Sequence, residues 1–159
     1  MIEKKFKELK EDQNTKILEF KNKIISSDPV FSAGYCDCNA VILFGNGVAG
    51  VSHYPFFMSP SNPDLCISQM IKKVHMISKE CKLEGVLIGG DETHFERNRY
   101  VLNMNNVPII GAYLDKWSYS GDGDEKIGEK DLIVVPKTKE VFLYINHFMI
   151  KTKEYIQVN

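Results

Sequence analysis

The sequence predicts an α+β domain in which helices cover a mixed or antiparallel sheet. Two predicted β-hairpins, over residues 39–53 and 132–145, require antiparallel pairing. Between them, segments with the apolar spacing of helices alternate with short apolar strands. The chain has 159 residues, of which 43% are hydrophobic and 26% charged, so it is long enough for one domain with its own core.

The charge balance and the N-terminal residues exclude several classes of protein. A net charge of -1 argues against nucleic acid as a partner. We predict no membrane insertion, because no apolar run reaches the roughly 18 residues of a membrane-spanning helix. The first eight residues, MIEKKFKE, lack the apolar core of a signal peptide. We therefore expect a cytoplasmic protein whose four cysteines are reduced.

Residues 1 to about 27 have the pattern of an amphipathic helix. Apolar residues recur at spacings of three and four, with charged residues between them: Ile2, Phe6, Leu9, Ile17, Phe20 and Ile24. Pro29 ends this segment, and a break at Asp12 to Thr15 that divides it into two helices is the alternative. We expect the helix to pack on the core, and docking of a protein partner is the alternative interpretation.

The first hairpin is predicted from Asn46-Gly47, which separates two apolar runs. Asn-Gly is typical of a type I′ turn, in which both central residues have positive φ. A two-residue loop places Leu43 opposite Gly50 and Ala40 opposite His53. Cys38 is then a diagonal neighbour of His53 at roughly 7–8 Å between backbones. Cys36 lies two residues further away, so the register favours Cys38 as the partner of His53.

The remaining segments are expected to alternate between helix, strand and loop. We predict a proline-rich loop, a helix, a buried strand, a helix and an edge strand, over residues 54–63, 64–82, 86–90, 91–106 and 107–113 respectively. A polar loop follows, in which Asp122-Gly123-Asp124 lacks the ligand pattern of a calcium-binding EF-hand. The second hairpin comes next, and the tail from residue 147 is expected to fray.

Three kinds of chemistry are compatible with the hairpin. A thiolate at Cys38, made available by the imidazole of His53, is a nucleophile, although two such side chains also meet by chance. Cys36, Cys38 and His53 together offer three metal ligands, but the one-residue spacing of the cysteines is unusual for zinc. Residues 45–50 match the G-x-G-x-x-G string, yet the expected continuation is a strand rather than the helix that a dinucleotide site requires.

The ordered set of motifs resembles the bacterial chemoreceptor glutamine deamidases, the CheD family. Ser32, Gly34 and Cys38 stand at the offsets of the family's T-x-G-x-G-S-C-like segment, and residues 50–53 match its G-x-x-H return. Further segments resemble its F-G-G, I-G-x-R-N and G-I-P-I motifs, at residues 88–90, 95–98 and 107–111, and the final hairpin, with residues 136–139, resembles its closing F-D-x-x-T-G-x-V segment. The resemblance covers residues 31–146.

The chain departs from the family pattern at several positions. Serine replaces the usual threonine at position 32, which keeps the hydroxyl group. Cys36 and Asp37 replace a small Gly-Ser pair, and an acidic neighbour raises the pKa of a thiol. The hairpin is about two residues shorter, and Asp115-Lys116-Trp117 stands where the family has a double glycine.

The resemblance implies a three-layer α/β/α deamidase domain over residues 31–146, with an N-terminal helical extension (1–30) and a C-terminal tail (147–159). It implies Cys38 as nucleophile, His53 as general base and Ser32 as the group that orients His53, with neither cofactor nor metal. The implied substrate is a glutamine on the helical cytoplasmic domain of a chemoreceptor, and a regulatory phosphatase is an implied partner. A non-catalytic binding module and an effector-type deamidase with another target are the alternatives.

Overall fold

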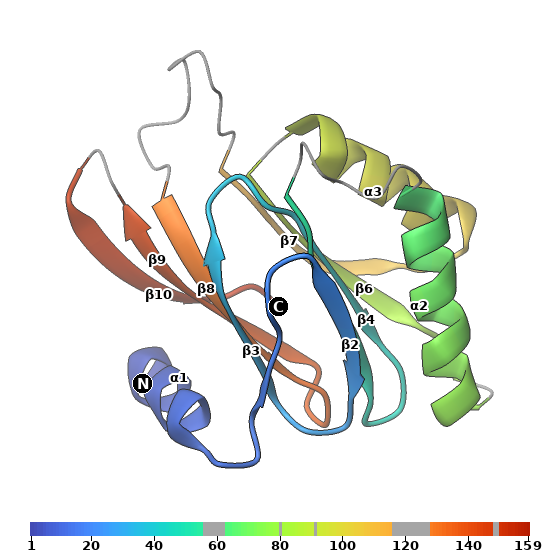
Figure 1. The fold of residues 1–159 in the computed structure, drawn as a ribbon, viewed down its shortest axis with the longest axis horizontal. Coiled ribbons are helices and arrows are strands. Elements are labelled where there is room, and N and C mark those ends of the chain that lie inside the picture. Colours follow the sequence, from blue (N-terminus) through green and yellow to red (C-terminus); the bar gives the residue numbers. More distant parts are fainter. Residues whose placement is uncertain (56–62, 80, 91, 116–127, 148–149) are drawn as a thin grey trace.

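The computed structural model describes residues 1–55, 63–79, 81–90, 92–115, 128–147 and 150–159 (Figure 1). Within them lie three helices: α1 (Ile2–Glu11), α2 (Pro63–Ile77) and α3 (Glu92–Met104). The first sheet has the order β1-β3-β8-β9-β10, with bounds Lys16–Ile17, Val30–Tyr35, Gly128–Val135, Glu140–His147 and Thr152–Gln157. The second sheet has the order β2-β5-β4-β6-β7, with bounds Asn22–Ser26, Ala49–His53, Ala40–Phe44, Glu84–Gly89 and Ile109–Leu114.

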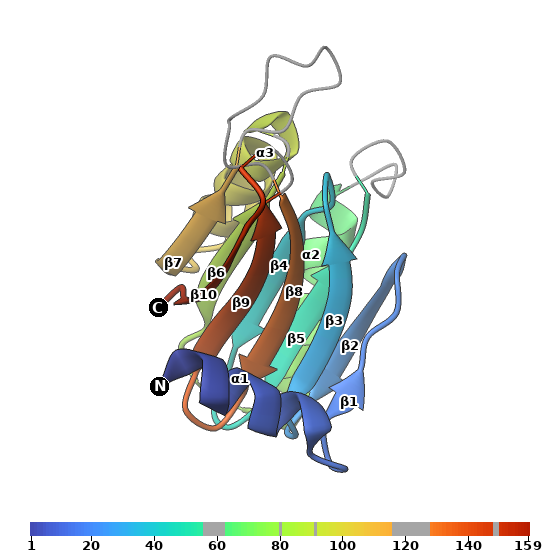
Figure 2. The same cartoon turned by 90° about the vertical axis from the view of Figure 1, so that its left-hand side faces the viewer.

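The predicted α+β class is confirmed, and the sheets are mixed but largely antiparallel. The pairs β1–β3 and β6–β7 are parallel, and the other strand pairs are antiparallel. The layers differ from the expected α/β/α arrangement, because two sheets replace the single sheet. They pack face to face, with α1 outside the first sheet and α2 and α3 outside the second (Figures 1 and 2).

The two sheets pack together because their central strands are apolar on both faces. All five residues of β4 are buried. Ile42 and Phe44 point between the sheets, where they meet strands of the first sheet in what we call the inter-sheet core. Val41 and Leu43 point the other way and pack against α2 and α3. On the outer face of the first sheet, Phe6 of α1 covers a smaller apolar cluster.

The prediction of helix over residues 1–27, as one helix or as two, is wrong beyond Glu11. The chain becomes extended after α1, and β1 and β2 add an edge strand to each sheet. Ile17 is exposed while Leu18 is buried in the inter-sheet core, which is the alternation of an extended chain. Pairing with β3 and β5 therefore overrides the helical spacing, and these residues are built into both sheets.

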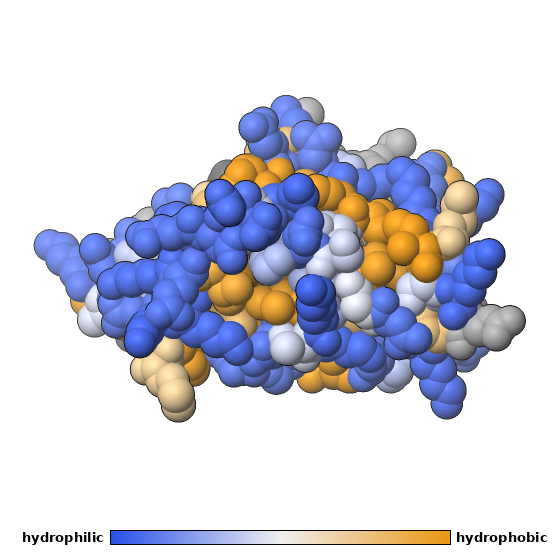
Figure 3. Space-filling view, turned by 90° about the horizontal axis from the view of Figure 1, so that it is seen from below, coloured by the Kyte–Doolittle hydropathy of each residue, from blue (hydrophilic) through white to orange (hydrophobic). Residues whose placement is uncertain are grey.

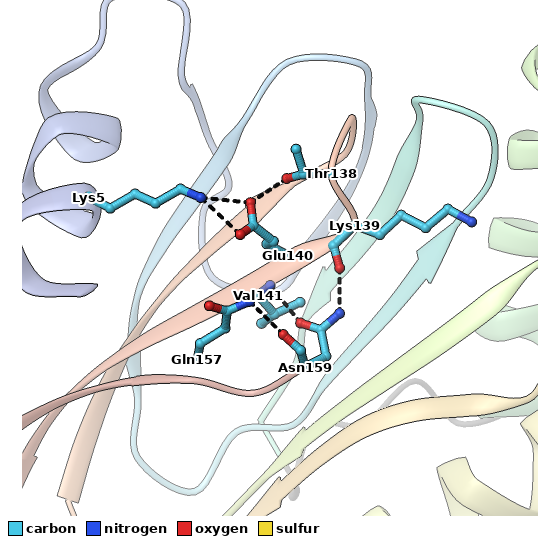
Figure 4. A network of polar contacts seen from close by, with 7 residues as sticks. All are labelled: Lys5, Thr138, Lys139, Glu140, Val141, Gln157 and Asn159. Carbon is cyan, nitrogen blue, oxygen red and sulfur yellow. Dashed lines mark hydrogen bonds and ion pairs between the residues drawn. The ribbon is translucent and has the colours of Figure 1, made fainter. Parts of the chain in front are cut away.

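The C-terminal tail does not fray, because β10 pairs along its length with β9. Beyond it, Val158 N–H donates to the carbonyl of Val141 at 2.9 Å. The Asn159 side chain accepts a hydrogen bond from Val141 N–H at 2.8 Å and donates one to the carbonyl of Lys139 (Figure 4). The last residues are therefore attached to the start of β9.

The start of β9 also fixes α1 to the first sheet. Glu140 accepts hydrogen bonds from Lys5 Nζ at 2.8 and 2.9 Å and from the Thr138 hydroxyl at 2.5 Å (Figure 4). This ion pair lies at the lower end of the sandwich. Seen from below, that end carries mostly hydrophilic side chains with apolar ones between them (Figure 3).

The predicted hairpin registers are confirmed where the structure describes them. Leu43 lies opposite Gly50, and Gly45 N–H donates to the Val48 carbonyl at 2.8 Å. The turn is not type I′, because only Gly47 of its two central residues has a positive φ, at 67°. The strands β8 and β9 form the second hairpin, and β7 is an edge strand as expected. The predicted loops at 54–63 and 117–131 fall largely on 56–62 and 116–127, outside the described residues.

Candidate functional site

Strand alternation brings six chemically active side chains to one end of the inter-sheet core. This end, at the top of Figure 1, is where β3, β5, β6 and β7 finish and β8 begins. Each side chain shares a strand face with apolar residues of the core, as His53 does with Ala49 and Val51. We call the group the polar end: Ser32, Tyr35, Cys38, His53, Asp115 and Lys130.

A chain of hydrogen bonds fixes the imidazole of His53. The Ser32 hydroxyl donates to the backbone carbonyl of Leu18 at 2.7 Å and lies 2.9 Å from His53 Nδ1. A serine hydroxyl has one proton and the contact to Leu18 is the shorter one, so we assign Nδ1–H as the donor to Ser32 Oγ. This assigns the tautomer in which Nε2 is unprotonated. The Nε2 atom is buried and has no hydrogen-bond partner among the described residues.

Two aromatic rings enclose His53. The ring of Tyr35 stacks on it at a centroid distance of 3.7 Å and 13° between planes. Phe20 meets it edge-on, with 5.5 Å between centroids, and Tyr35 is itself held by its hydroxyl, which donates to the Ser52 carbonyl at 3.0 Å. Only 1% of His53 is exposed, and burial lowers its pKa from 6.5 to about 4. The imidazole is therefore neutral at pH 7, with a free basic nitrogen.

Cys38 lies on the same face as His53, as the register predicted. An isolated bridge between Asn39 and Tyr54 extends the hairpin register, so Cys38 remains the diagonal neighbour of His53. Cys38 is 2% exposed and belongs to the inter-sheet core, whereas Cys36 is half-buried. The Sγ atom of Cys38 lies 4.0 Å from Asp37 Oδ1 and is not hydrogen-bonded to His53 Nε2.

The thiol of Cys38 is protonated in this structure. Burial, and then the carboxylate of Asp37, raise its pKa from 9.0 to about 12, and Lys130 opposes this rise. Together with the neutral His53, the site therefore holds a thiol beside a free base rather than a thiolate–imidazolium pair. A base of this kind removes the thiol proton only as the sulfur attacks.

An ion pair and an amide that were not predicted from the sequence lie at the same end. Lys130 and Asp115 form a buried ion pair, with 2.6 Å between Nζ and Oδ2. Asn39 is buried with neither side-chain polar atom hydrogen-bonded among the described residues. The alternation of Lys130 with Leu132 and Val134 indicates an inward lysine, but Ile133 obscures that pattern. All the unpartnered buried polar atoms of the described side chains lie at this end of the sandwich.

The alternative chemistries find no support in the described residues. Among the described residues, no group of three or more His, Cys, Asp and Glu side chains is placed to hold a metal. Cys36, Cys38 and His53 therefore do not form such a group. The glycine segment at 45–50 runs into β5, so no helix begins there as a dinucleotide site requires.

Comparison with known proteins gives no family assignment. No protein-family model matches the chain, and no curated protein is significantly similar to it. The resemblance to the CheD family therefore rests on the order and spacing of the motifs. Within the described part of the chain, no helix combines the length and apolar character that are needed to cross a membrane.

Proposed function

We propose that this protein is a protein-glutamine deamidase of the CheD type, with Cys38 as nucleophile, His53 as general base and Ser32 as the group that orients His53. One observation carries the proposal. The bond from His53 Nδ1–H to Ser32 Oγ leaves Nε2 unprotonated and unpartnered, on the strand face that also carries Cys38. A nucleophile, a base and an orienting group on the base are the parts that triad catalysis requires.

The proposed reaction begins when His53 Nε2 takes the proton of Cys38 and Sγ attacks the carboxamide carbon of a glutamine side chain. His53 then gives this proton to the departing nitrogen, so ammonia leaves and a thioester remains. In the second half, Nε2 takes a proton from water, and the oxygen of that water attacks the thioester carbon. The carbon–sulfur bond breaks, Cys38 regains its proton, and the product is glutamate.

The pKa values of the resting site support proton transfer during attack rather than before it. Burial holds His53 neutral and Cys38 protonated, so a preformed ion pair does not exist at pH 7. The hydrogen bond to Ser32 strengthens when His53 becomes positively charged, because charge-assisted hydrogen bonds are stronger than neutral ones. Ser32 thus stabilises the charged state of the base as well as its orientation.

The resemblance supplies the proposed substrate and partner. In the CheD family the modified glutamine lies on the helical cytoplasmic domain of a chemoreceptor, and a phosphatase partner regulates the enzyme. We propose the same class of substrate for this protein. In a variant of this proposal the protein is an effector that deamidates a different target protein.

A non-catalytic binding module is the second candidate. The observation that favours it is the burial of Cys38 and His53, which are 2% and 1% exposed. In this case the fold would present a surface to a protein partner, and the thiol would be a core residue with a raised pKa.

The test is deamidation of chemoreceptor cytoplasmic helices, measured as ammonia release and as a one-dalton mass gain. Wild type is compared with Cys38→Ala, His53→Ala and the matched control Cys36→Ala. We expect activity in wild type and Cys36→Ala and its loss in the other two. Loss in Cys36→Ala alone would contradict the assigned nucleophile. Absence of activity in wild type, with slow and uniform labelling of all four cysteines by a thiol reagent, would favour the binding module.

A further inference from the structure

The ion pair between Lys130 and Asp115 is fully enclosed in the protein. The two side chains are 0% and 1% exposed, and 2.6 Å separates Nζ from Oδ2. Lys130 comes from the beginning of β8, and Asp115 follows the end of β7, so the pair joins the two sheets. The backbone N–H of Asp115 also donates to the Gly89 carbonyl at 3.3 Å, which fixes the acid to the end of β6.

Lys130 uses all three of its ammonium hydrogens. Besides Asp115, Nζ donates to the carbonyl of Gly128 at 3.1 Å and to the carbonyl of Cys36 at 3.3 Å. The second of these carbonyls lies two residues before the proposed nucleophile. A fully hydrogen-bonded lysine therefore connects the end of the second sheet to the segment that carries Cys38.

This segment is restrained from a second direction by Gly90. A Cβ atom at position 90 would lie 2.2 Å from the carbonyl oxygen of Cys36 and 3.0 Å from the Cα of Asp37. The carbonyl of Cys36 is thus enclosed between a glycine backbone and the ammonium of Lys130. These contacts leave the peptide between Cys36 and Asp37 little freedom to rotate.

Stability alone does not explain this arrangement. The desolvation penalty of a buried ion pair offsets most of its electrostatic gain, and well-packed apolar residues of similar volume are often as stable. Here one carboxylate oxygen, Asp115 Oδ1, is also left without a hydrogen-bond partner among the described residues. An apolar pair would avoid this cost but could not hold the carbonyl of Cys36.

We propose that Lys130 is a positioning residue for the nucleophile, which holds the Cys36 carbonyl and supplies the positive charge that favours the thiolate of Cys38 during attack. This inference rests on the proposed function, because it takes Cys38 as the nucleophile. Asp37 is one of the departures from the family pattern, and its carboxylate places a negative charge beside the Cys38 thiol. The positive charge of Lys130 counteracts that negative charge from β8, where Lys130 pairs with Tyr35 at the end of β3.

The ionisable groups around Cys38 define what the lysine has to offset. Cys36 and Asp37 belong to the same segment, Tyr35 comes from β3 and His53 from β5. Burial, the carboxylate of Asp37 and the neighbouring thiol of Cys36 raise the pKa of Cys38, while Lys130 lowers it. His53 is neutral in the resting site, so it does not share this role.

The test compares wild type, Lys130→Met and Lys130→Arg in the full chain. The rate of Cys38 alkylation by iodoacetamide is measured against pH, with peptide mapping to resolve each cysteine. Cys66, which lies on the buried face of α2 on the other side of the second sheet, is the internal control. For Lys130→Met we expect the Cys38 profile to move upward by about one pH unit, which is about tenfold in rate at a given pH. Lys130→Arg should retain most of the wild-type profile, and Cys66 should not respond.

Two results would overturn the inference: a Lys130→Met profile that superimposes on wild type, or equal shifts in the methionine and arginine variants. The second would show that packing rather than charge is responsible. If Lys130→Met fails to fold, the double variant Asp115→Asn/Lys130→Met takes the place of the single variant in the comparison. It also removes the carboxylate that the single variant leaves unpaired. Deamidation that persists in Cys38→Ala would contradict the proposed function separately, since the alkylation profile measures Lys130 and Cys38 alone.

Discussion

Replacement of Ser32 by alanine is the sharpest single test of the hydrogen-bond chain at His53. Ser32 is fully buried, and its hydroxyl joins the Leu18 carbonyl at 2.7 Å to His53 Nδ1 at 2.9 Å. Alanine removes one oxygen atom and changes little else in the packing. After the change, both the carbonyl of Leu18 and the Nδ1–H of His53 lack their partner in a buried environment.

The expected loss of stability follows from those two groups. A buried donor or acceptor left without a partner costs about 1–3 kcal/mol, so two of them cost about 4 kcal/mol in the middle of the combined range. We therefore expect the free energy of unfolding to fall by about 4 kcal/mol in Ser32→Ala. Ser32→Thr keeps the hydroxyl and is expected to lose much less.

Urea unfolding followed by circular dichroism measures this difference. Ser27→Ala is the matched control, because Ser27 is exposed between β2 and β3. Surface substitutions of this kind usually change stability by less than about 0.5 kcal/mol. A loss of that small size in Ser32→Ala would refute the reasoning, since it would mean that water or another group satisfies Leu18 and His53.

Two further predictions concern His53 and Gly90. Because burial lowers the pKa of His53 from 6.5 to about 4, its stabilising effect is complete above pH 6.5 and is lost as the pH falls toward 4. Between pH 7.5 and 5 wild type should lose about 2 kcal/mol more than His53→Gln, measured by urea unfolding, and parallel losses would contradict the buried, neutral imidazole. Gly90→Ala should slow deamidation at least about tenfold, because its Cβ would displace the Cys36 carbonyl and a misplaced reacting group costs catalysis heavily. Gly45→Ala, whose Cβ would meet the side chains of Val74 and Ser78 away from the site, is the control, and equal activity in the two variants would refute that placement.

Local sequence signals were sufficient for the first hairpin and its register. Asn46-Gly47 defines the turn, and the register then makes Cys38 the diagonal neighbour of His53, with Cys36 two residues further away. The prediction that Ser32 contacts His53 came from the motif resemblance, because the two residues are 21 positions apart. Their hydrogen bond is present in the structure, whereas the reaction stays a prediction.

Other features depend on long-range packing that the sequence does not encode locally. Strands that are apolar on both faces are compatible with one sheet between two helix layers and also with two sheets packed face to face. For this reason the number of layers was predicted wrongly. Residues 16–26 have helical spacing but pair with β3 and β5 instead. Lys130 is charged, which is usual on a surface, and only its partner from the other sheet makes its burial possible.

The separations along the chain at the polar end have a consequence for biosynthesis. Leu18 and Ser32 are 14 residues apart, while Cys36 and Lys130 are 94 residues apart. A nascent chain therefore carries Cys38 and His53 long before the ribosome has added the lysine that holds the Cys36 carbonyl. Strand β8 must pair with β3 before this contact forms, so the arrangement is a late product of folding. During translation the thiol lacks its finished surroundings, and the complete constellation appears only in a chain that has been synthesised through β8.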